Sequence, residues 1–284
     1  MGYRPRFFSL SRFTIWAERL AYIAMPLAII AILVTRSGQV PALTGVVLLA
    51  VSALLSALAL ALVAVGLVDI WRHGHEGLGG AFRASVVASL VLAFPAYLAV
   101  QAGRLPRLND ISTDLVNPPR FQTSPAALRA RGGHTPPDRD ARLREPQRLA
   151  YPEIRPLVLE MDIDEAFGIV KDAAQTLKWR ITVEIAPPAI APVRAPSPPA
   201  RTGRQQTPPP PPTPVVPQVR QASLEAVAET RLMRFQDDVV IRLVQAGEGT
   251  RVDIRSASRI GQHDFGTNAA RIRRLIDEIS TPRE

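Results

Sequence analysis

The sequence predicts two parts of different fold class: an α-helical transmembrane bundle of three spans, and a C-terminal α+β domain whose antiparallel sheet packs helices on one face. Two observations predict this division. Nearly all long apolar runs precede Gly103, whereas most of the 27 prolines and most charged residues follow it. Further along, apolar residues alternate at strand spacing or recur at helix spacing. We therefore expect a transmembrane domain over 1–103, an irregular linker over 104–155 and a soluble domain over 156–284.

The first span is expected over residues 13–35. This apolar run has about the length that crosses a hydrocarbon core of roughly 30 Å. Only Glu18 and Arg19 interrupt it, near one end, where an ion pair or long side chains can reach the headgroups. The run is too long for the apolar part of a signal peptide, and no small-residue cleavage pattern ends it. We therefore expect an uncleaved helix.

The second and third spans are expected over residues 40–70 and 84–102. Ser52 and Ser56 lie four residues apart in the second span, with alanines alongside. Small residues at this spacing let helix backbones approach closely, so they indicate packing within one bundle. Three spans place the two ends of the chain on opposite sides of a membrane. Almost no charge lies at their centres, which disfavours a channel or transporter.

The orientation of the bundle follows from arginines in short loops, because positive residues near helix ends stay in the cytoplasm. The first loop has only Arg36, whereas the N-terminal stretch and the second loop hold Arg4, Arg6, Arg12, Arg72 and Arg83. We therefore expect a bacterial cytoplasmic-membrane protein of the cell envelope with its N-terminus in the cytoplasm. Its C-terminal domain would be periplasmic or otherwise extracytoplasmic.

The soluble domain is expected to begin with a short strand over 157–159 and a helix capped by Asp162 and Glu165, which form a D-x-x-E capping pattern. Alternating apolar residues predict the later strands. These strands cover 179–185, 225–235, 239–245 and 250–256, with a tight turn at 236–238 and a final helix over 268–279. Strands joined by tight turns run antiparallel. A proline-rich stretch over 186–222 cannot bury a core and predicts a disordered insertion.

Composition argues against several classes of site. The chain has no cysteine, which excludes disulfides and thiolate metal sites. His73, His75 and Glu76 crowd into a glycine-rich turn with no second cluster to complete a coordination shell, so we predict no metal site and no cofactor. The net charge of +9 is spread without interleaved aromatics, so we expect no nucleic-acid partner.

The densest polar stretch leads into the final helix and is the candidate binding site. A helix N-terminus attracts anions, Thr267 or Asn268 can cap it, and arginines can fork onto a phosphate or carboxylate. Arg271 opposes the helix dipole, so it needs a bound anion or a partner carboxylate. The candidate binding residues are Ser256, Ser258, Arg259, Gly261, Asp264, Gly266, Thr267, Asn268 and Arg271.

The alternative for the same stretch is a membrane-tethered hydrolase. Ser256 or Ser258 would be the nucleophile, with His263 as base and Asp264 as its orienting group. No nucleophile elbow, glycine-rich oxyanion turn or paired carboxylate accompanies these residues. We therefore predict no catalytic residues.

Three strings resemble the uncharacterised membrane-associated proteins of domain-of-unknown-function family 1499: NDISTDLVNPPRF, AVAETRLMRFQDDVVIRL and VDIRSASRIGQHDFGTNAARI. The resemblance covers Leu108 to about Ile279 without the proline-rich stretch. Many relatives carry a cysteine-containing segment near the start of the domain, where residues 109–121 here have none, which disfavours a redox role. By matching position, the signature loop comprises Arg259, Gly261, Asp264, Gly266 and Asn268.

The family name implies no activity. We expect a non-catalytic binding or interaction module of the cell envelope. Its expected partners are membrane lipids and either an anionic ligand or another envelope protein.

Overall fold

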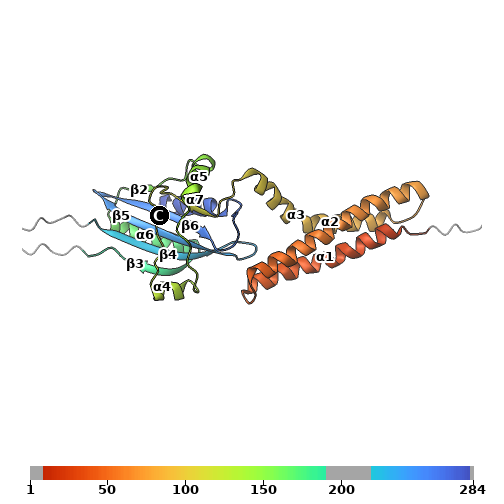
Figure 1. Ribbon diagram of the computed structural model, residues 1–284, viewed down its shortest axis with the longest axis horizontal. Coiled ribbons are helices and arrows are strands. Elements are labelled where there is room, and N and C mark those ends of the chain that lie inside the picture. Colours follow the sequence, from red (N-terminus) through yellow and green to blue (C-terminus); the bar gives the residue numbers. More distant parts are fainter. Residues whose placement is uncertain (1–8, 190–218, 282–284) are drawn as a thin grey trace, which may run out of the picture.

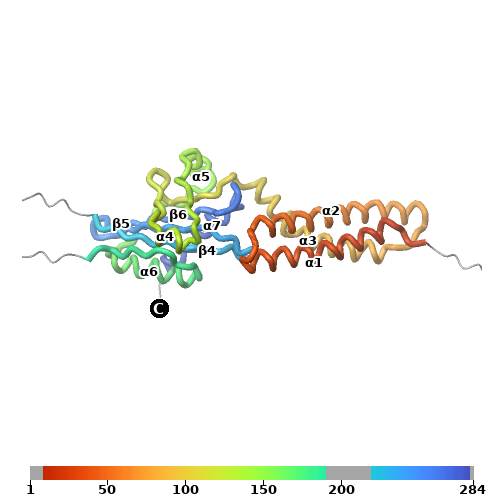
Figure 2. The backbone as a smooth tube through the Cα atoms, turned by 60° about the horizontal axis from the view of Figure 1, so that its bottom comes forward, coloured from red at the N-terminus to blue at the C-terminus, as the bar shows by residue number. Residues whose placement is uncertain are grey.

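The computed structural model describes residues 9–189 and 219–281 and has two parts. Three long helices lie side by side and form a bundle, and a sheet domain adjoins one end of it (Figures 1 and 2). The connections between the first and second helices, and between the third helix and the domain, lie at the same end of the bundle. The turn between the second and third helices lies at the opposite end. Most of the proline-rich stretch predicted over 186–222 lies outside the described residues.

The bundle consists of α1 (Arg12–Ser37), α2 (Ala42–His73) and α3 (Leu78–Arg104). Each helix is long and apolar enough to cross a membrane, with mean hydropathies of 1.9, 2.8 and 1.8 in its most apolar window. The three predicted helices are therefore confirmed, and all are longer than expected. The third begins six residues before Ala84, because the turn already ends at Gly77, whose φ of 140° suits glycine alone.

Small residues let the helices of the bundle approach closely. In α2, Ser52 and Ser56 are fully buried, as expected for a packing face. A Cβ added at Gly45 would lie 1.6 Å from the Thr35 side chain, and one at Gly66 would lie 2.6 Å from Thr14. Alanines line the matching face of α1. The large apolar side chains instead point outward, the arrangement of helices whose solvent is lipid.

The two charged residues in the first span have separate partners. Glu18 accepts a hydrogen bond of 2.7 Å from Arg83 of α3. The guanidinium of Arg19 lies 5.3 Å from the centre of the Trp16 ring. The ion pair therefore joins two helices at the end of the bundle that lies away from the domain.

The domain is built on a six-stranded antiparallel sheet. The strands are β1 (Asp110–Ser112), β2 (Leu157–Leu159), β3 (Arg180–Ile185), β4 (Gln221–Glu229), β5 (Gln236–Ala246) and β6 (Gly249–Ser258). Their order is β1-β6-β5-β4-β3, and β2 pairs with another part of β6. Helices α6 (Ile163–Thr176) and α7 (Thr267–Ser280) pack on one face, as predicted. Asp162 caps α6 by accepting from the N–H groups of Asp164 and Glu165.

The segment expected to be an irregular linker is instead part of this domain. It contains β1, α4 (Pro125–Ala130), the 3-10 helix η1 (Ala141–Leu143) and α5 (Arg144–Ala150). Part of it lies over the face of the sheet opposite α6 and α7, where Phe121 packs on Val240 and Ala257. The guanidiniums of Arg131 and Arg255 lie 5.6 and 5.2 Å from the Phe121 ring centre. The segment has no apolar period because it covers the sheet largely with arginines and turns.

Buried ion pairs attach this segment to the sheet. Arg255 of β6 is 1% exposed and donates to both carboxylate oxygens of Asp110, at 2.7 to 3.2 Å. Arg131 and Glu225 of β4 are both fully buried and form an ion pair. Each guanidinium also donates to backbone carbonyls of the segment, such as those of Gln122 and Pro137. The first residue of the domain is therefore near Asp110 and not near position 156.

The turn between β4 and β5 also differs from the sequence expectation. We expected it at 236–238, after a strand ending at 235. The structure ends β4 at Glu229, and a backbone bond from Thr230 N–H to Phe235 oxygen closes the turn at 2.9 Å. Asp237 and Asp238 thus belong to β5. Aspartates favour turns on local preference, but here Asp237 pairs with the buried Arg271 and Asp238 with the partly buried Arg259.

Candidate functional site

The predicted binding residues lie at the end of the domain that faces the bundle. Ser256 and Ser258 are at the end of β6, and Thr267, Asn268 and Arg271 lie in the first turns of α7. The structure joins Ser256, Ser258, Asn268 and Arg271 in one network and places Arg259 in a second. Gly261 takes part through its carbonyl oxygen, which accepts from the Asn109 side chain at 2.9 Å. The backbone N–H of Thr267 donates to the Asp264 carbonyl at 3.0 Å.

The first network centres on the buried guanidinium of Arg271. One of its nitrogens donates to Asp237 of β5 at 2.5 Å, and the other donates to Ser256 at 2.9 Å and Asn268 at 2.6 Å. The Asn268 amide in turn donates to Ser258 at 2.9 Å. The carboxylate of Asp237 therefore offsets the unfavourable position of the Arg271 charge near the positive end of the helix dipole, and no bound anion is needed for this.

The second network centres on Asp238, which is fully buried. Arg259 forks onto its carboxylate with two bonds of 3.0 and 2.6 Å, and donates to Gln236 at 2.7 Å. The ring of His134 lies 2.7 Å from the same carboxylate. Such a fork is a strong and directional pair. It fixes the loop after β6 to the start of β5.

Sequence reasoning missed Asp237, Asp238 and His134. The two aspartates were interpreted as a turn, and His134 lay in the supposed linker. A usable signal was present: two consecutive acidic residues stand before an apolar strand, and six arginines lie in the last 30 residues of the domain, Arg259 and Arg271 among them. Buried carboxylates need such partners, so an acidic pair beside a buried strand indicates arginines nearby.

The N-terminus of α7 holds a carboxylate of the chain itself. We expected Thr267 or Asn268 to cap this helix, but Gly266 occupies the cap position with φ of 79° and Asp264 supplies the acceptor. Its two oxygens accept from the N–H groups of Gly266 and Asn268, both at 2.9 Å. Burial nevertheless raises the pKa of Asp264, outweighing these two bonds, which lower it. The place where an anion was expected is thus filled.

The arrangement does not assemble the hydrolase that the sequence left as an alternative. Ser256 donates to Asn268 at 2.7 Å and is fully buried. The Nδ1 atom of His263 accepts from the backbone N–H of Phe265 at 2.9 Å, and its ring stacks on that of Phe265. Neither serine bonds to His263 in the described part of the chain. A serine nucleophile needs a base within hydrogen-bond reach.

The comparisons with known proteins agree with the limits of this domain. A family model described as "Protein of unknown function (DUF1499)" matches residues 110–279, more than half of the chain. The chain belongs to the DUF1499 family. No curated protein and no solved structure matches the chain. The match begins at the first residue of β1 and ends within α7, so the DUF1499 domain includes the segment over 110–155.

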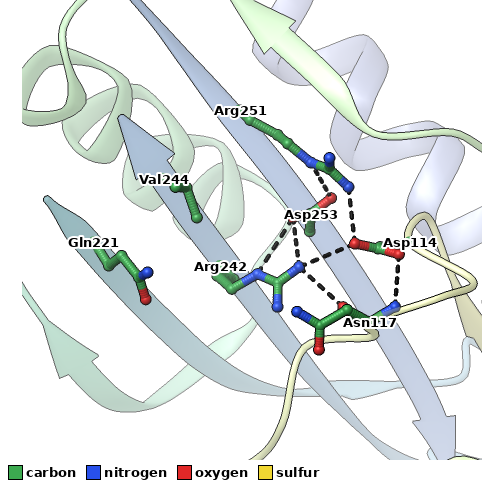
Figure 3. A pocket seen from close by; sticks show the side chains of 7 residues that line it. All are labelled: Asp114, Asn117, Gln221, Arg242, Val244, Arg251 and Asp253. Carbon is green, nitrogen blue, oxygen red and sulfur yellow. Dashed lines mark hydrogen bonds and ion pairs between the residues drawn. The ribbon is translucent and has the colours of Figure 1, made fainter. Parts of the chain in front are cut away.

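A second polar cluster lies on the face of the sheet opposite α6 and α7, around a hollow of about 320 Å³ (Figure 3). Arg251 bonds to Asp114 at 2.8 Å and to Asp253 at 3.0 Å. Arg242 bonds to the same two carboxylates, at 3.2 and 2.7 Å. Two positive and two negative groups cancel, so the hollow presents no net charge to an ion. The cluster attaches the chain near Asn117 to β5 and β6.

Three segments form the end of the domain nearest the bundle, which we call the bundle-facing end: residues 105–109, the turn 230–235 and the loop 259–266 (Figure 1). Arg36, at the end of α1, donates to the carbonyls of Arg231 and Leu232 at 2.8 and 3.0 Å. Arg234 returns a bond of 3.4 Å to the Arg36 carbonyl. A Cβ added at Gly266 would lie 3.0 Å from the Leu105 side chain. The ion pairs Asp237–Arg271 and Asp238–Arg259 fix the positions of two of these segments, the turn 230–235 and the loop 259–266.

The exposed side chains at the bundle-facing end are mainly positive. Arg107, Arg231 and Arg234 lie in these segments, and Arg36 and Arg104 lie at the adjoining helix ends; all five are exposed, and Arg234 forms an ion pair with Glu229. Leu232 and Ile260 lie among the same segments and are 38% and 39% exposed. Acidic side chains are few in these segments: only Asp264 lies within them, and it is buried. This surface therefore combines positive charge with apolar side chains.

We expect Arg271→Ala to destabilise the domain by about 3–5 kcal/mol, because it leaves the carboxylate of Asp237 buried without its partner. The matched variant Arg274→Ala removes an exposed arginine of the same helix and should change stability by less than about 0.5 kcal/mol. Chemical unfolding of the full-length protein in detergent micelles measures both. Equal effects of the two substitutions would contradict the role assigned to the Asp237–Arg271 pair.

The raised pKa of Asp264 predicts a pH dependence. Because the folded domain holds this proton to a higher pH than the unfolded chain, the stabilisation from Asp264 is complete at low pH. It is lost as pH rises from about 4 through the raised pKa. The free energy of unfolding of the wild type, relative to Asp264→Asn, should therefore fall between pH 4 and pH 8. If the free energy of unfolding of the wild type, relative to Asp264→Asn, rose over this range, it would contradict a pKa of Asp264 that burial raises.

Proposed function

We propose that this chain is a membrane-anchored, non-catalytic binding protein of the cell envelope, and that its bundle-facing end binds the anionic headgroups of the surrounding lipid. The helices α1 to α3 span the cytoplasmic membrane, and the DUF1499 domain stands on its extracytoplasmic surface. The observation that carries the proposal is the contact of Arg36 with the turn 230–235. This contact places Arg36, Arg231 and Arg234 together where α1 ends, and the exposed Arg104 and Arg107 lie where α3 ends.

Membrane insertion is supported by the outer surface of the bundle. Apolar side chains that point away from the other helices include Leu54, Leu58 and Leu90, which are 49% to 70% exposed. Soluble proteins rarely expose continuous apolar surfaces of this extent. All three helices also exceed the length that a hydrocarbon core of roughly 30 Å requires. A bilayer around the bundle would cover these side chains.

The orientation is supported by the arginine distribution. The end of the bundle away from the domain holds Arg12, Arg72 and Arg83, and the sequence before it adds Arg4 and Arg6. Short positively charged loops stay in the cytoplasm, and larger translocated domains respond weakly to this rule. The arginines of the bundle-facing end are thus compatible with an extracytoplasmic domain. Because they do not determine the orientation of the helices, their presence there needs a different explanation.

Contact with anionic lipid supplies that explanation. A lysine or arginine near an anionic membrane surface contributes about 1 kcal/mol of attraction. Leu232 and Ile260 can enter the interfacial region between the arginines, because apolar side chains favour this boundary. The buried networks around Asp237 and Asp238 then act as the frame of the surface. Under this proposal, the predicted residues Ser256, Ser258, Asn268 and Arg271 shape the site and do not touch the ligand.

A non-catalytic role is supported by the hydrogen bonds of the polar residues. The serines, Asn268 and Arg271 bond to one another, and Asp264 bonds to the helix N-terminus. Ser256 is buried, Ser258 is partly buried, and neither bonds to a histidine among the residues that the structure describes. Such a network contributes to the stability of the domain and specifies its shape.

The test uses the full-length protein in a neutral detergent, titrated with phosphatidylglycerol or phosphatidylcholine, with the melting temperature of the domain as readout. Phosphatidylglycerol should raise the melting temperature and phosphatidylcholine should raise it much less. Arg107→Gln combined with Arg231→Gln removes two positive charges whose side chains form no ion pair among the described residues. This double variant should lose most of the shift.

The matched control is Arg120→Gln with Arg129→Gln, which removes two exposed arginines from the segment over the face of the sheet opposite α6 and α7. It should keep the wild-type shift. An equal response to both lipids, or an undiminished shift in the Arg107 and Arg231 variant, would overturn the proposal. Turnover of ester or phosphoester substrates that is lost in a folded Ser256→Ala variant would instead favour the hydrolase.

A further inference from the structure

Two histidines and one aspartate meet at the other end of the bundle, in the turn between α2 and α3. The Nδ1 atom of His73 lies 3.0 Å from one carboxylate oxygen of Asp69, and that of His75 lies 2.8 Å from the other. The ligand atoms of the three side chains all lie within 4.8 Å of one another. Asp69 was not among the residues that the sequence brought together here.

The local backbone explains why these residues meet. Asp69 and His73 are four residues apart at the end of α2, so they share one face of the helix. Gly74 then adopts a left-handed conformation, with φ of 70°, and ends the helix. The chain reverses there, which returns His75 to the face that carries Asp69. The two imidazole rings stack with their centres 5.6 Å apart.

The turn is held in place by the segment before α1. The backbone N–H of Ser11 donates to the Glu76 carbonyl at 2.9 Å, and the Glu76 N–H donates to the Ser9 carbonyl at 3.2 Å. Leu10 and Glu76 pair as an isolated parallel bridge. His75 is therefore adjacent to a residue whose backbone is fixed on both sides. The three ligands are arranged before any ion arrives.

We propose that Asp69, His73 and His75 form a binding site for one divalent first-row transition-metal ion, of which Zn²⁺ is the type. Imidazole nitrogen with a carboxylate suits zinc, copper, nickel and iron, whereas magnesium and calcium prefer oxygen ligands alone. Two nitrogens and one oxygen leave a fourth position for water or another ligand, as in open zinc sites. The side chain of His73 is 62% exposed, which leaves the site accessible.

The present distances need only a small adjustment for this role. Zinc binds nitrogen and oxygen at about 2.0–2.2 Å, so tetrahedral ligand atoms lie roughly 3.3–3.6 Å apart. The two contacts, of 3.0 Å from His73 and 2.8 Å from His75, go to different oxygens of Asp69, and the one to the oxygen that binds the ion would open by about half an ångström. The three ligand atoms already lie within 4.8 Å of one another. Each imidazole would bind through Nδ1 as a neutral ring with its proton on Nε2. The negative end of the α2 dipole also favours a cation here.

The site lies away from the DUF1499 domain and does not depend on the proposed lipid binding. An ion there would join the end of α2 to the turn that contacts Ser9 and Ser11. It would thereby fasten α1 and α2 at this end of the bundle. From the sequence we predicted that His73, His75 and Glu76 form no metal site. The proposed site keeps the two histidines and takes its carboxylate from Asp69.

The test uses the full-length protein in detergent, without a histidine tag and stripped of metal by a chelator, titrated with ZnCl₂ by calorimetry. We expect one saturable zinc site per chain and a higher melting temperature of the bundle with zinc. Mg²⁺ should produce neither. Asp69→Asn and His75→Ala each remove or weaken a direct ligand, so each should reduce binding by at least the roughly tenfold that the loss of a residue supporting a ligand costs.

Glu76→Gln is the matched control, because it removes a neighbouring exposed carboxylate while its backbone contacts remain. It should bind zinc as the wild type does. The proposal is overturned if no saturable site is found, or if Asp69→Asn and His75→Ala bind zinc as tightly as the wild type. Equal weakening by Glu76→Gln would also overturn it, because it would indicate general attraction of cations to the turn.

Discussion

Two consecutive aspartates at the start of β5 are paired with arginines from the last part of the domain, Asp237 with Arg271 and Asp238 with Arg259. Neighbouring residues in a strand point to opposite faces, so the two pairs hold both faces of the sheet at the same end. The turn 230–235 precedes these aspartates directly, and the loop 259–266 lies between the two arginines. Removing one member of such a pair leaves an uncompensated buried charge. The structure of this end of the domain therefore depends on both pairs.

This constraint connects the interior of the domain to its position on the bundle. Arg36 bonds to backbone carbonyls of the turn and not to side chains, so the contact depends on the path of the turn. That path follows from the start of β5. The polar residues that the sequence suggested as a binding or catalytic site thus hold the domain's structure together, and the arginines around them are exposed. The family match over 110–279 covers the complete frame but not the bundle.

Sequence reasoning succeeded where structure follows from local patterns. The apolar runs predicted the three long helices, and Asp162 with its apolar period predicted α6. It failed where a residue's role depends on a distant partner. Asp110 begins a strand of three residues because its carboxylate pairs with Arg255, and Asp237 belongs to a strand because Arg271 reaches it. Neither partner can be found from neighbours in the chain. The position of Asp69 beside His75 likewise depends on the reversal at Gly74.

The most direct measurement of the central claim is the side of the membrane on which each end of the bundle lies. The chain has no cysteine, so single substitutions can be labelled in intact cells with a membrane-impermeant maleimide. Cysteine at Leu232, in the turn that Arg36 contacts, should react in intact cells, whereas cysteine at Glu76 should react only after lysis. Labelling of Glu76→Cys in intact cells with protection of Leu232→Cys would contradict a domain that stands on the extracytoplasmic surface.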